Sequence, residues 1–316
     1  MMKNVNTLLA LALLGLAFGC AREDQGTAPE NVGETAVGET TGALSVFTVN
    51  YPLAYFAERI GGDLVTVTFP APGDVDPAYW APGPEKVAEY QQADLILLNG
   101  VGYAKWLQRA TLPAGKMADT SRSFENRWVP LEGGAVHSHG LEGEHSHKGY
   151  AFTTWLDPLL AIEQARSVAQ ALREALPEHE DRLQVSLEAL VTDLQQLDGA
   201  LMSATEGIGG QPLLFSHPVY QYLISRYGLN ARSVHWEPDQ EPNDDQWQEL
   251  QAIVDESAAQ WMIWEGQPTK ATVGRLAELG IQSAVYAPCA NRPSDGDLLS
   301  VMRLNVATLL EISAQK

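Results

Sequence analysis

The sequence is poor in basic residues, in cysteine and in long apolar runs. Lys and Arg total 20 against 40 Asp and Glu among 316 residues, which gives a formal net charge of -20. Because phosphate binding needs clustered basic side chains, we expect no nucleic-acid partner. The two cysteines, Cys20 and Cys289, lie in such different contexts that no disulfide is expected between them. The hydrophobic content of 45% is nevertheless enough for two domains with cores of their own.

The start of the chain has the pattern of an export signal. The apolar run Leu8–Phe18 is too short to span a bilayer comfortably, and we interpret residues 1–19 as a signal peptide. The segment Leu16–Cys20 resembles a bacterial lipobox, where signal peptidase cuts before a cysteine that carries lipid. Phe18 replaces the small residue usual there, so secretion without a lipid is the alternative. We therefore expect a cell-envelope protein on the periplasmic or extracellular face, lipid-anchored through Cys20.

A leucine stripe predicts one long helix near the middle of the chain. The leucines recur at spacings of three and four residues, which places them on one helix face: Leu183, Leu187, Leu190, Leu194, Leu197 and Leu201. Pro177 suits a first helical turn, and Gly207 follows where the helix can stop. Because no second helix of similar length is evident, a coiled coil or bundle is not favoured. We expect a rigid helix over 178–206 that connects two halves.

Strand and helix patterns alternate on both sides of this helix. Before it, strands are expected at Val46–Val49, Leu64–Phe69 and Leu95–Leu98, and helices at Leu53–Ile60, Glu85–Gln92 and Ala104–Arg109. After it, strands are expected at Leu213–Phe215, Ala231–Val234, Trp261–Trp264 and Ser283–Tyr286, and helices at Val219–Tyr227, Asp244–Ser257, Thr269–Leu279 and Asp297–Ile312. Such alternation predicts parallel sheets covered by helices.

The expected organisation is an α/β protein of two lobes with a ligand cleft between them. The lobes cover 45–155 and 211–316, connecting helices cover 156–210, and a flexible acidic tether covers 20–44. In open α/β sheets ligands bind at the carboxyl ends of strands, so the loops there should line the cleft.

Four histidines gather in a Gly- and Glu-rich loop over 135–148, at His137, His139, His145 and His147. Imidazoles this close bind divalent transition metals such as Zn, Cu or Ni with little need for a preformed fold. We expect the loop to collect metal rather than to hold it in a defined geometry. The alternative is a solvated loop in which the histidines are accidental.

Three further residues follow strands and therefore face the expected cleft. His217 comes after Leu213–Phe215, and we interpret it as a metal ligand rather than a core residue. Glu265 and Cys289 follow the strands at Trp261–Trp264 and Ser283–Tyr286. Glu265 is either a ligand or a cap of the next helix. For Cys289 a small buried apolar residue is the favoured interpretation.

A series of short motifs follows in order along the chain after Val46: Tyr51-Pro52, Ile60-Gly61-Gly62, Pro72-Gly73, Asp76-Pro77, Ala93-Asp94-Leu95, Asn99-Gly100, Trp155-Leu156-Asp157-Pro158, Tyr227-Gly228-Leu229, Glu265-Gly266-Gln267-Pro268 and Met302-Arg303-Leu304-Asn305. With these motifs the chain resembles, from Val46 to its end, the solute-binding lipoproteins of zinc- and manganese-importing ABC transporters, the cluster A-I metal-binding proteins. The resemblance implies two four-stranded α/β lobes bridged by a rigid helix. It also implies a metal held by three histidines and a carboxylate.

Of those family ligands this sequence retains His217 alone. Ala78, Thr153 and Ala287 stand at the other positions. A methyl group cannot coordinate, and a threonine hydroxyl is a poor zinc ligand. Either His217 combines with Glu265, Cys289 or loop histidines, or the cleft holds an organic or metal-chelate ligand. Aromatic residues that could then line it are Tyr79, Trp80, Trp155, Trp236 and Trp264.

The resemblance implies an extracytoplasmic substrate-binding component that captures Zn²⁺ or a similar divalent cation and delivers it to an ABC permease. We expect a monomer attached to the membrane by its lipid. A binding protein with an organic or chelate ligand, and a scaffold or adhesin that no longer transports metal, are the alternatives. An enzyme is not expected, because no HExxH-type pair or nucleophile motif occurs.

Overall fold

The protein was analysed as a computed structural model that describes residues 42–131, 136–138, 144–146 and 149–315. The N-terminal lobe is built on a parallel sheet of order β2-β1-β3-β4. Its strands are β1 (Leu44–Thr48), β2 (Val65–Thr68), β3 (Leu95–Leu98) and β4 (Met117–Asp119), and its helices are α1 (Tyr51–Gly61) and α2 (Pro84–Gln92). β1 and β3 are the central strands. Consecutive residues of each are buried, so side chains on both faces of the sheet are covered, as expected when helices pack on both sides.

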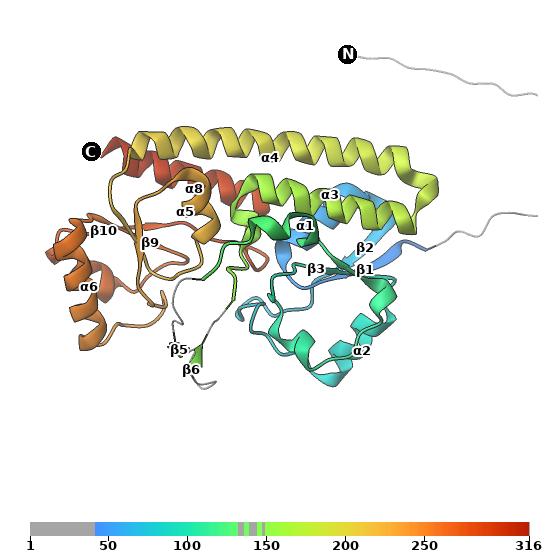
Figure 1. The fold of residues 1–316 in the computed structure, drawn as a ribbon, viewed down its shortest axis with the longest axis horizontal. Coiled ribbons are helices and arrows are strands. Elements are labelled where there is room, and N and C mark those ends of the chain that lie inside the picture. Colours follow the sequence, from blue (N-terminus) through green and yellow to red (C-terminus); the bar gives the residue numbers. More distant parts are fainter. Residues whose placement is uncertain (1–41, 132–135, 139–143, 147–148, 316) are drawn as a thin grey trace, which may run out of the picture. The chain divides into compact units, whose positions relative to one another are not determined.

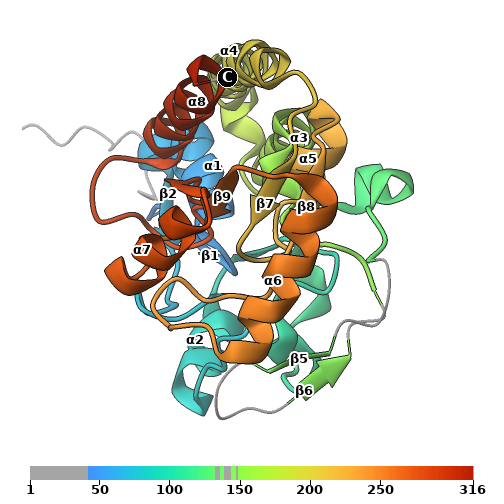
Figure 2. The same cartoon turned by 90° about the vertical axis from the view of Figure 1, so that its left-hand side faces the viewer.

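The C-terminal lobe repeats this plan with a parallel sheet of order β10-β9-β7-β8. Figure 2 shows β9, β7 and β8 side by side in this sheet. Its strands are β7 (Leu213–Phe215), β8 (Ala231–Ser233), β9 (Trp261–Trp264) and β10 (Gln282–Val285). Its helices are α5 (Gln221–Tyr227), α6 (Asp244–Ser257), α7 (Lys270–Glu278) and α8 (Leu298–Ala314). The predicted fold class, two four-stranded α/β lobes with a long helix, is confirmed.

The long helix α4 spans Glu180–Ile208, after a 3-10 turn, η7 (Pro177–His179). All six leucines of the predicted stripe are buried. Figure 1 shows α4 running alongside α3 (Pro158–Ala175) and α8. It also contacts α1 of the N-terminal lobe and α5 of the C-terminal lobe, so it connects the lobes as expected. Gly209 ends it in a left-handed conformation (φ 59°), which glycine adopts without steric cost.

Capping side chains set the other helix starts that matter for the cleft. Asn50 accepts a hydrogen bond from the backbone N–H of Leu53 at the start of α1. Asn243 and Asp297 form reciprocal caps with Gln246 and Ser300 at the starts of α6 and α8. Each such cap satisfies backbone donors that a helix start leaves open.

Three local features differ from the sequence expectations. The short edge strand β4 was not predicted, because its three residues combine Met117 and Ala118 with the charged Asp119, whereas the equally short β7 is entirely apolar. Ala104–Arg109 was expected to be an α-helix, but it forms a 3-10 turn, η2 (Lys105–Gln108). In the histidine loop, β5 (Val136–Ser138) and β6 (Glu144–Ser146) pair antiparallel.

Within the described ranges, no helix has the length and apolarity needed to cross a membrane.

Candidate metal site in the cleft between the lobes

Three side chains that could ligate a metal follow three adjacent strands of the C-terminal sheet. His217 follows β7, Glu265 follows β9 and Glu237 follows β8. The sheet order places β9, β7 and β8 side by side, and all are parallel, so their carboxyl ends meet at one edge. The backbone N–H of Ser216 donates to Ile263 O (2.8 Å) and that of Trp236 donates to Ser216 O (2.7 Å), which extends this alignment beyond the strands.

The three side chains form one group. One possible ligand atom from each of His217, Glu237 and Glu265 lies within 4.8 Å of the others, and all three side chains are partly buried. His217 Nδ1 lies 3.2 Å from Glu265 Oε1. The residue after Glu237 is bonded to the start of α7: the carbonyl oxygen of Pro238 accepts a hydrogen bond from the backbone N–H of Thr269 (3.0 Å), which caps that helix. Imidazole and carboxylates so close together are a donor set for a divalent transition metal.

The electrostatics of the group favour a positive charge. Burial lowers the pKa of His217, but its hydrogen bond with Glu265 and the negative charges of Glu265, Glu237 and Asp76 raise it, and the net result is a raised pKa. The surrounding carboxylates therefore favour a cation at this position. A divalent metal would replace the proton with twice the charge.

The group lies on the wall of a cavity of about 640 Å³, which we call the interlobe cleft. The N-terminal lobe contributes Gly73–Pro77 and Tyr103, and the C-terminal lobe contributes the three ligating residues and segment 287–291. The acidic residues that line it are Asp74, Asp76, Glu237 and Glu265. Neither Lys nor Arg occurs among the described residues that line the cleft. The charge of this lining disfavours anionic ligands.

The structure places the other three positions at which the resemblance implied ligands as follows. Ala78 is fully buried. The Thr153 hydroxyl donates a hydrogen bond to Val219 O. Ala287 is fixed by Asn305, whose side-chain amide bonds both its N–H (2.9 Å) and its carbonyl oxygen (2.8 Å). The group of three possible ligands comes from the C-terminal lobe, and the N-terminal lobe adds the carboxylates of Asp74 and Asp76 to the cleft lining.

The other residues expected at the cleft divide into two sets. Thr153, Trp155, Glu265 and Cys289 line it. Tyr79 and Trp80 are not among its lining residues, and the Tyr79 ring instead packs edge-to-face on Phe152, at 6.4 Å between centroids. Trp236 and Trp264 do not line the cleft either, because both are buried in a separate hydrophobic core of the C-terminal lobe. Glu265 does not cap α7, since Thr269 does.

Cys289 lines the cleft as a protonated thiol. Burial, with a smaller contribution from the charge of Asp297, raises its pKa to about 12. Its backbone has a positive φ of 58°, and Sγ lies 3.8 Å from Asn291 O. Because only the thiolate is a good metal ligand, this cysteine is a weaker candidate than the imidazole and carboxylates.

Sequence reasoning missed Glu237. It lies beyond the last paired residue of β8, Ser233, after an extended stretch that includes the buried Trp236. The rule that selected Glu265, an acidic residue shortly after a strand, applies equally to Glu237. The same loop also carries Asp239 and Glu241, and only the folded structure shows that Glu237 is the one that lies beside His217 and Glu265.

Most of the histidine loop lies outside the described residues. His137 and His145 occupy paired positions of β5 and β6, while His139 and His147 are outside the described residues.

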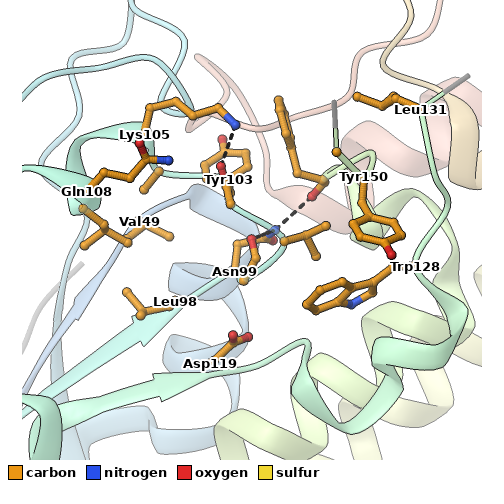
Figure 3. A pocket seen from close by; sticks show the side chains of 17 residues that line it. Val49, Leu98, Asn99, Tyr103, Lys105, Gln108, Asp119, Trp128, Leu131 and Tyr150 are labelled. Carbon is orange, nitrogen blue, oxygen red and sulfur yellow. Dashed lines mark hydrogen bonds between the residues drawn. The ribbon is translucent and has the colours of Figure 1, made fainter. Parts of the chain in front are cut away.

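A second cavity of about 610 Å³ lies within the N-terminal lobe (Figure 3). Lys105 and Asp119 lie toward opposite ends of the view, with Trp128 and Tyr150 on one side. Lys105 Nζ donates to Gly102 O (2.7 Å), and Asn99 Nδ2 donates to Phe152 O (2.9 Å). Tyr103 and Phe152 line this cavity as well as the interlobe cleft, so they form the partition between the two. No described group of three ligating side chains occurs in this cavity.

Comparisons with known proteins agree with this architecture. The family described as zinc-uptake complex component A, periplasmic (ZnuA), matches residues 46–312. The high-affinity zinc uptake system protein ZnuA of Bacillus subtilis (strain 168) is 25% identical over 246 residues, which are 77% of each chain. The manganese ABC transporter substrate-binding lipoprotein PsaA of Streptococcus pneumoniae is 26% identical over 242 residues, 75% of this chain and 73% of PsaA.

Solved structures share the fold at lower identity. The Zn(II)-bound ZnuA-like domain of AdcA from Streptococcus pneumoniae has a TM-score of 0.73 at 20% identity, over 86% of this chain and 99% of that one. The metal-dependent lipoprotein YcdH from Bacillus subtilis has a TM-score of 0.72 at 21% identity, over 85% and 98%. With the family model matched over both lobes, the chain belongs to the ZnuA family of periplasmic zinc-uptake components.

Proposed function

We propose that the protein is the extracytoplasmic substrate-binding component of an ABC importer for a divalent transition metal of the zinc type. It binds the metal in the interlobe cleft and delivers it to a permease, without bond chemistry. The observation that carries this proposal is the group of His217, Glu237 and Glu265. The names of the relatives support it, since they describe zinc uptake and manganese transport.

The chemistry of the donor set fits this cargo. A neutral imidazole and two carboxylates supply nitrogen and oxygen ligands that Zn²⁺ and Mn²⁺ both accept. Two carboxylates neutralise a divalent ion, which offsets the cost of taking it out of water. Asp76, whose charge already acts on His217, adds a negative field from the N-terminal lobe. The cargo is thus held on one lobe and attracted by the other.

The remaining expectations follow from this role. Residues 1–19 direct export, Cys20 carries the lipid, and 20–44 tether the lobes to the membrane. His137, His139, His145 and His147 collect metal. The protein acts as a monomer on the permease. The lipoprotein names of several relatives support the anchor.

Calorimetric titration of Zn²⁺ and Mn²⁺ into the metal-stripped protein tests the site. His217→Ala and Glu237→Gln should each weaken the tight site by about 10-fold or more, as expected when a group that ligates or orients a ligand is lost. Glu237→Gln keeps the size of the side chain and removes its charge.

The matched control is Glu241→Gln, an exposed acidic residue of the same loop that does not line the cleft. It should leave the affinity unchanged. Equal affinities of the parent protein, His217→Ala and Glu237→Gln would refute the assignment of the metal to this group.

A further inference from the structure

The interlobe cleft is larger than a metal ion needs. Its volume is about 640 Å³. An ion with a full shell of six waters occupies roughly 200 Å³, at about 30 Å³ per water. Cavities for small organic molecules span about 300–1,000 Å³. The cleft belongs by volume to the second class.

The protein leaves coordination positions open. His217, Glu237 and Glu265 supply one ligand atom each, from one side of the cleft. Zinc takes at least four ligands, so a further donor must come from outside this group. Asp74 and Asp76 line the cleft from the N-terminal lobe and are not part of this group, and Ala287 has no side-chain donor atom. The remaining coordination positions are therefore open to a donor that enters the cavity.

The wall contributed by the N-terminal half is aromatic. The Tyr103 ring packs edge-to-face against Phe152 (5.2 Å between centroids) and against Trp155 (5.8 Å), and all three line the cleft. Tyr103 is only 2% exposed, and its hydroxyl has no hydrogen-bond partner within the described part of the chain. A bare ion on the opposite lobe uses neither an aromatic surface nor a buried phenol, whereas an organic ligand uses both.

The charge of the cleft limits the kind of organic ligand. The described lining carries Asp74 and Asp76 in addition to the two ligating glutamates, and no Lys or Arg. A chelator with several carboxylates would meet these charges without a basic partner. A neutral chelator with nitrogen donors would not.

We propose that the cleft takes its metal as a complex with a small, neutral, nitrogen-donor heteroaromatic chelator. The metal is bound by His217, Glu237 and Glu265, and the chelator fills the open coordination positions and packs on Phe152, Tyr103 and Trp155. This inference rests on the proposed function, because it uses the same metal site.

The test uses 2,2′-bipyridine as the neutral probe and citrate as the anionic one. Each is titrated into the zinc-loaded full-length protein, with native mass spectrometry to count protein, metal and chelator. Bipyridine should form a saturable complex of one protein, one zinc and one bipyridine. Citrate should form no such complex and should only withdraw zinc.

Two variants locate the probe. Phe152→Ala should weaken bipyridine binding about 10-fold more than it weakens zinc binding, because it removes part of the aromatic wall. Tyr150→Ala, an aromatic residue that lines the other cavity and not the cleft, should leave bipyridine binding unchanged. Equal effects of the two variants would overturn the placement of the chelator in the cleft.

The two proposals fail in different ways. If zinc alone binds tightly and bipyridine only removes it, the chelate inference is overturned and the metal-import proposal stands. If zinc alone fails to bind but preformed zinc–bipyridine binds, the chelate inference stands and capture of a bare ion is refuted. If neither binds, both proposals fall.

Discussion

Single residues decide what the cleft can hold. His217 was selected from the sequence because it follows a strand, and it lies on the cleft wall beside Glu265. Glu237 completes the group, but its loop also carries Asp239 and Glu241, and nothing in the spacing separates the three. Which of these acidic residues lies beside His217 is determined by contacts between residues distant in sequence, and those contacts depend on how the strands are ordered in the sheet.

Asp297 provides a residue-scale prediction with a defined pH dependence. Its side chain accepts from Ser300 N (2.8 Å) at the start of α8. Burial raises the pKa of Asp297, but the hydrogen bonds from Ser300 and Tyr55 and the charge of Arg59 lower it by more, so the pKa lies below the usual 3.8. A depressed pKa means that the carboxylate stabilises the fold above the unfolded-state pKa, and that this stability is lost as the pH falls through the folded-state value.

Asp297→Ala should therefore lower the free energy of unfolding at pH 7 by about 1 kcal/mol, the usual cost of removing a cap. The difference from the parent protein should shrink as the pH is brought below about 4. Urea denaturation at several pH values measures both. Asp295→Ala, an exposed neighbour, is the control. A deficit that persists unchanged at low pH would show that the charge plays no part.

At the scale of elements, strong periodicity was readable and weak periodicity was not. The leucines of α4 recur at helical spacing, and the buried strands β3, β7 and β9 are runs of consecutive apolar residues, so both patterns predict their place. β4 and the 3-10 turn η2 show neither pattern, and their form is set by packing around them.

The stripe makes a direct prediction for stability. Leu190→Ala removes a fully buried side chain of α4 and should cost about 2–5 kcal/mol in the free energy of unfolding. Val185→Ala, on the same helix but 67% exposed, should change it by less than about 0.5 kcal/mol. Chemical denaturation of the two variants gives the comparison. Similar losses for both would contradict the assignment of one wet and one buried face.

At the scale of the whole described molecule, one segment of the C-terminal lobe is bonded to the N-terminal half beside the cleft. Trp155 Nε1 donates to Pro288 O (2.8 Å), and Tyr51 N donates to Ala290 O (3.0 Å). Asn291 Nδ2 donates to the carbonyl oxygens of Pro72 (2.6 Å) and Val75 (3.0 Å). These bonds connect the wall that carries Glu265 with the wall that carries Asp76.

The fold and the family follow from the sequence because they depend on many residues at once. A metal site depends on few residues, and the three candidate ligands of the cleft are grouped on one lobe. The histidine loop and the cleft are two separate candidates for metal binding, so an experiment must distinguish metal bound by one from metal bound by the other.

The most direct measurement is a calorimetric titration of Zn²⁺ into metal-stripped protein that lacks residues 135–148, and so lacks the loop histidines. We predict that one tight site per molecule survives the deletion and is lost when His217→Ala is added. Weak binding at several sites in the intact protein, abolished by deleting the loop, would contradict a metal site in the cleft.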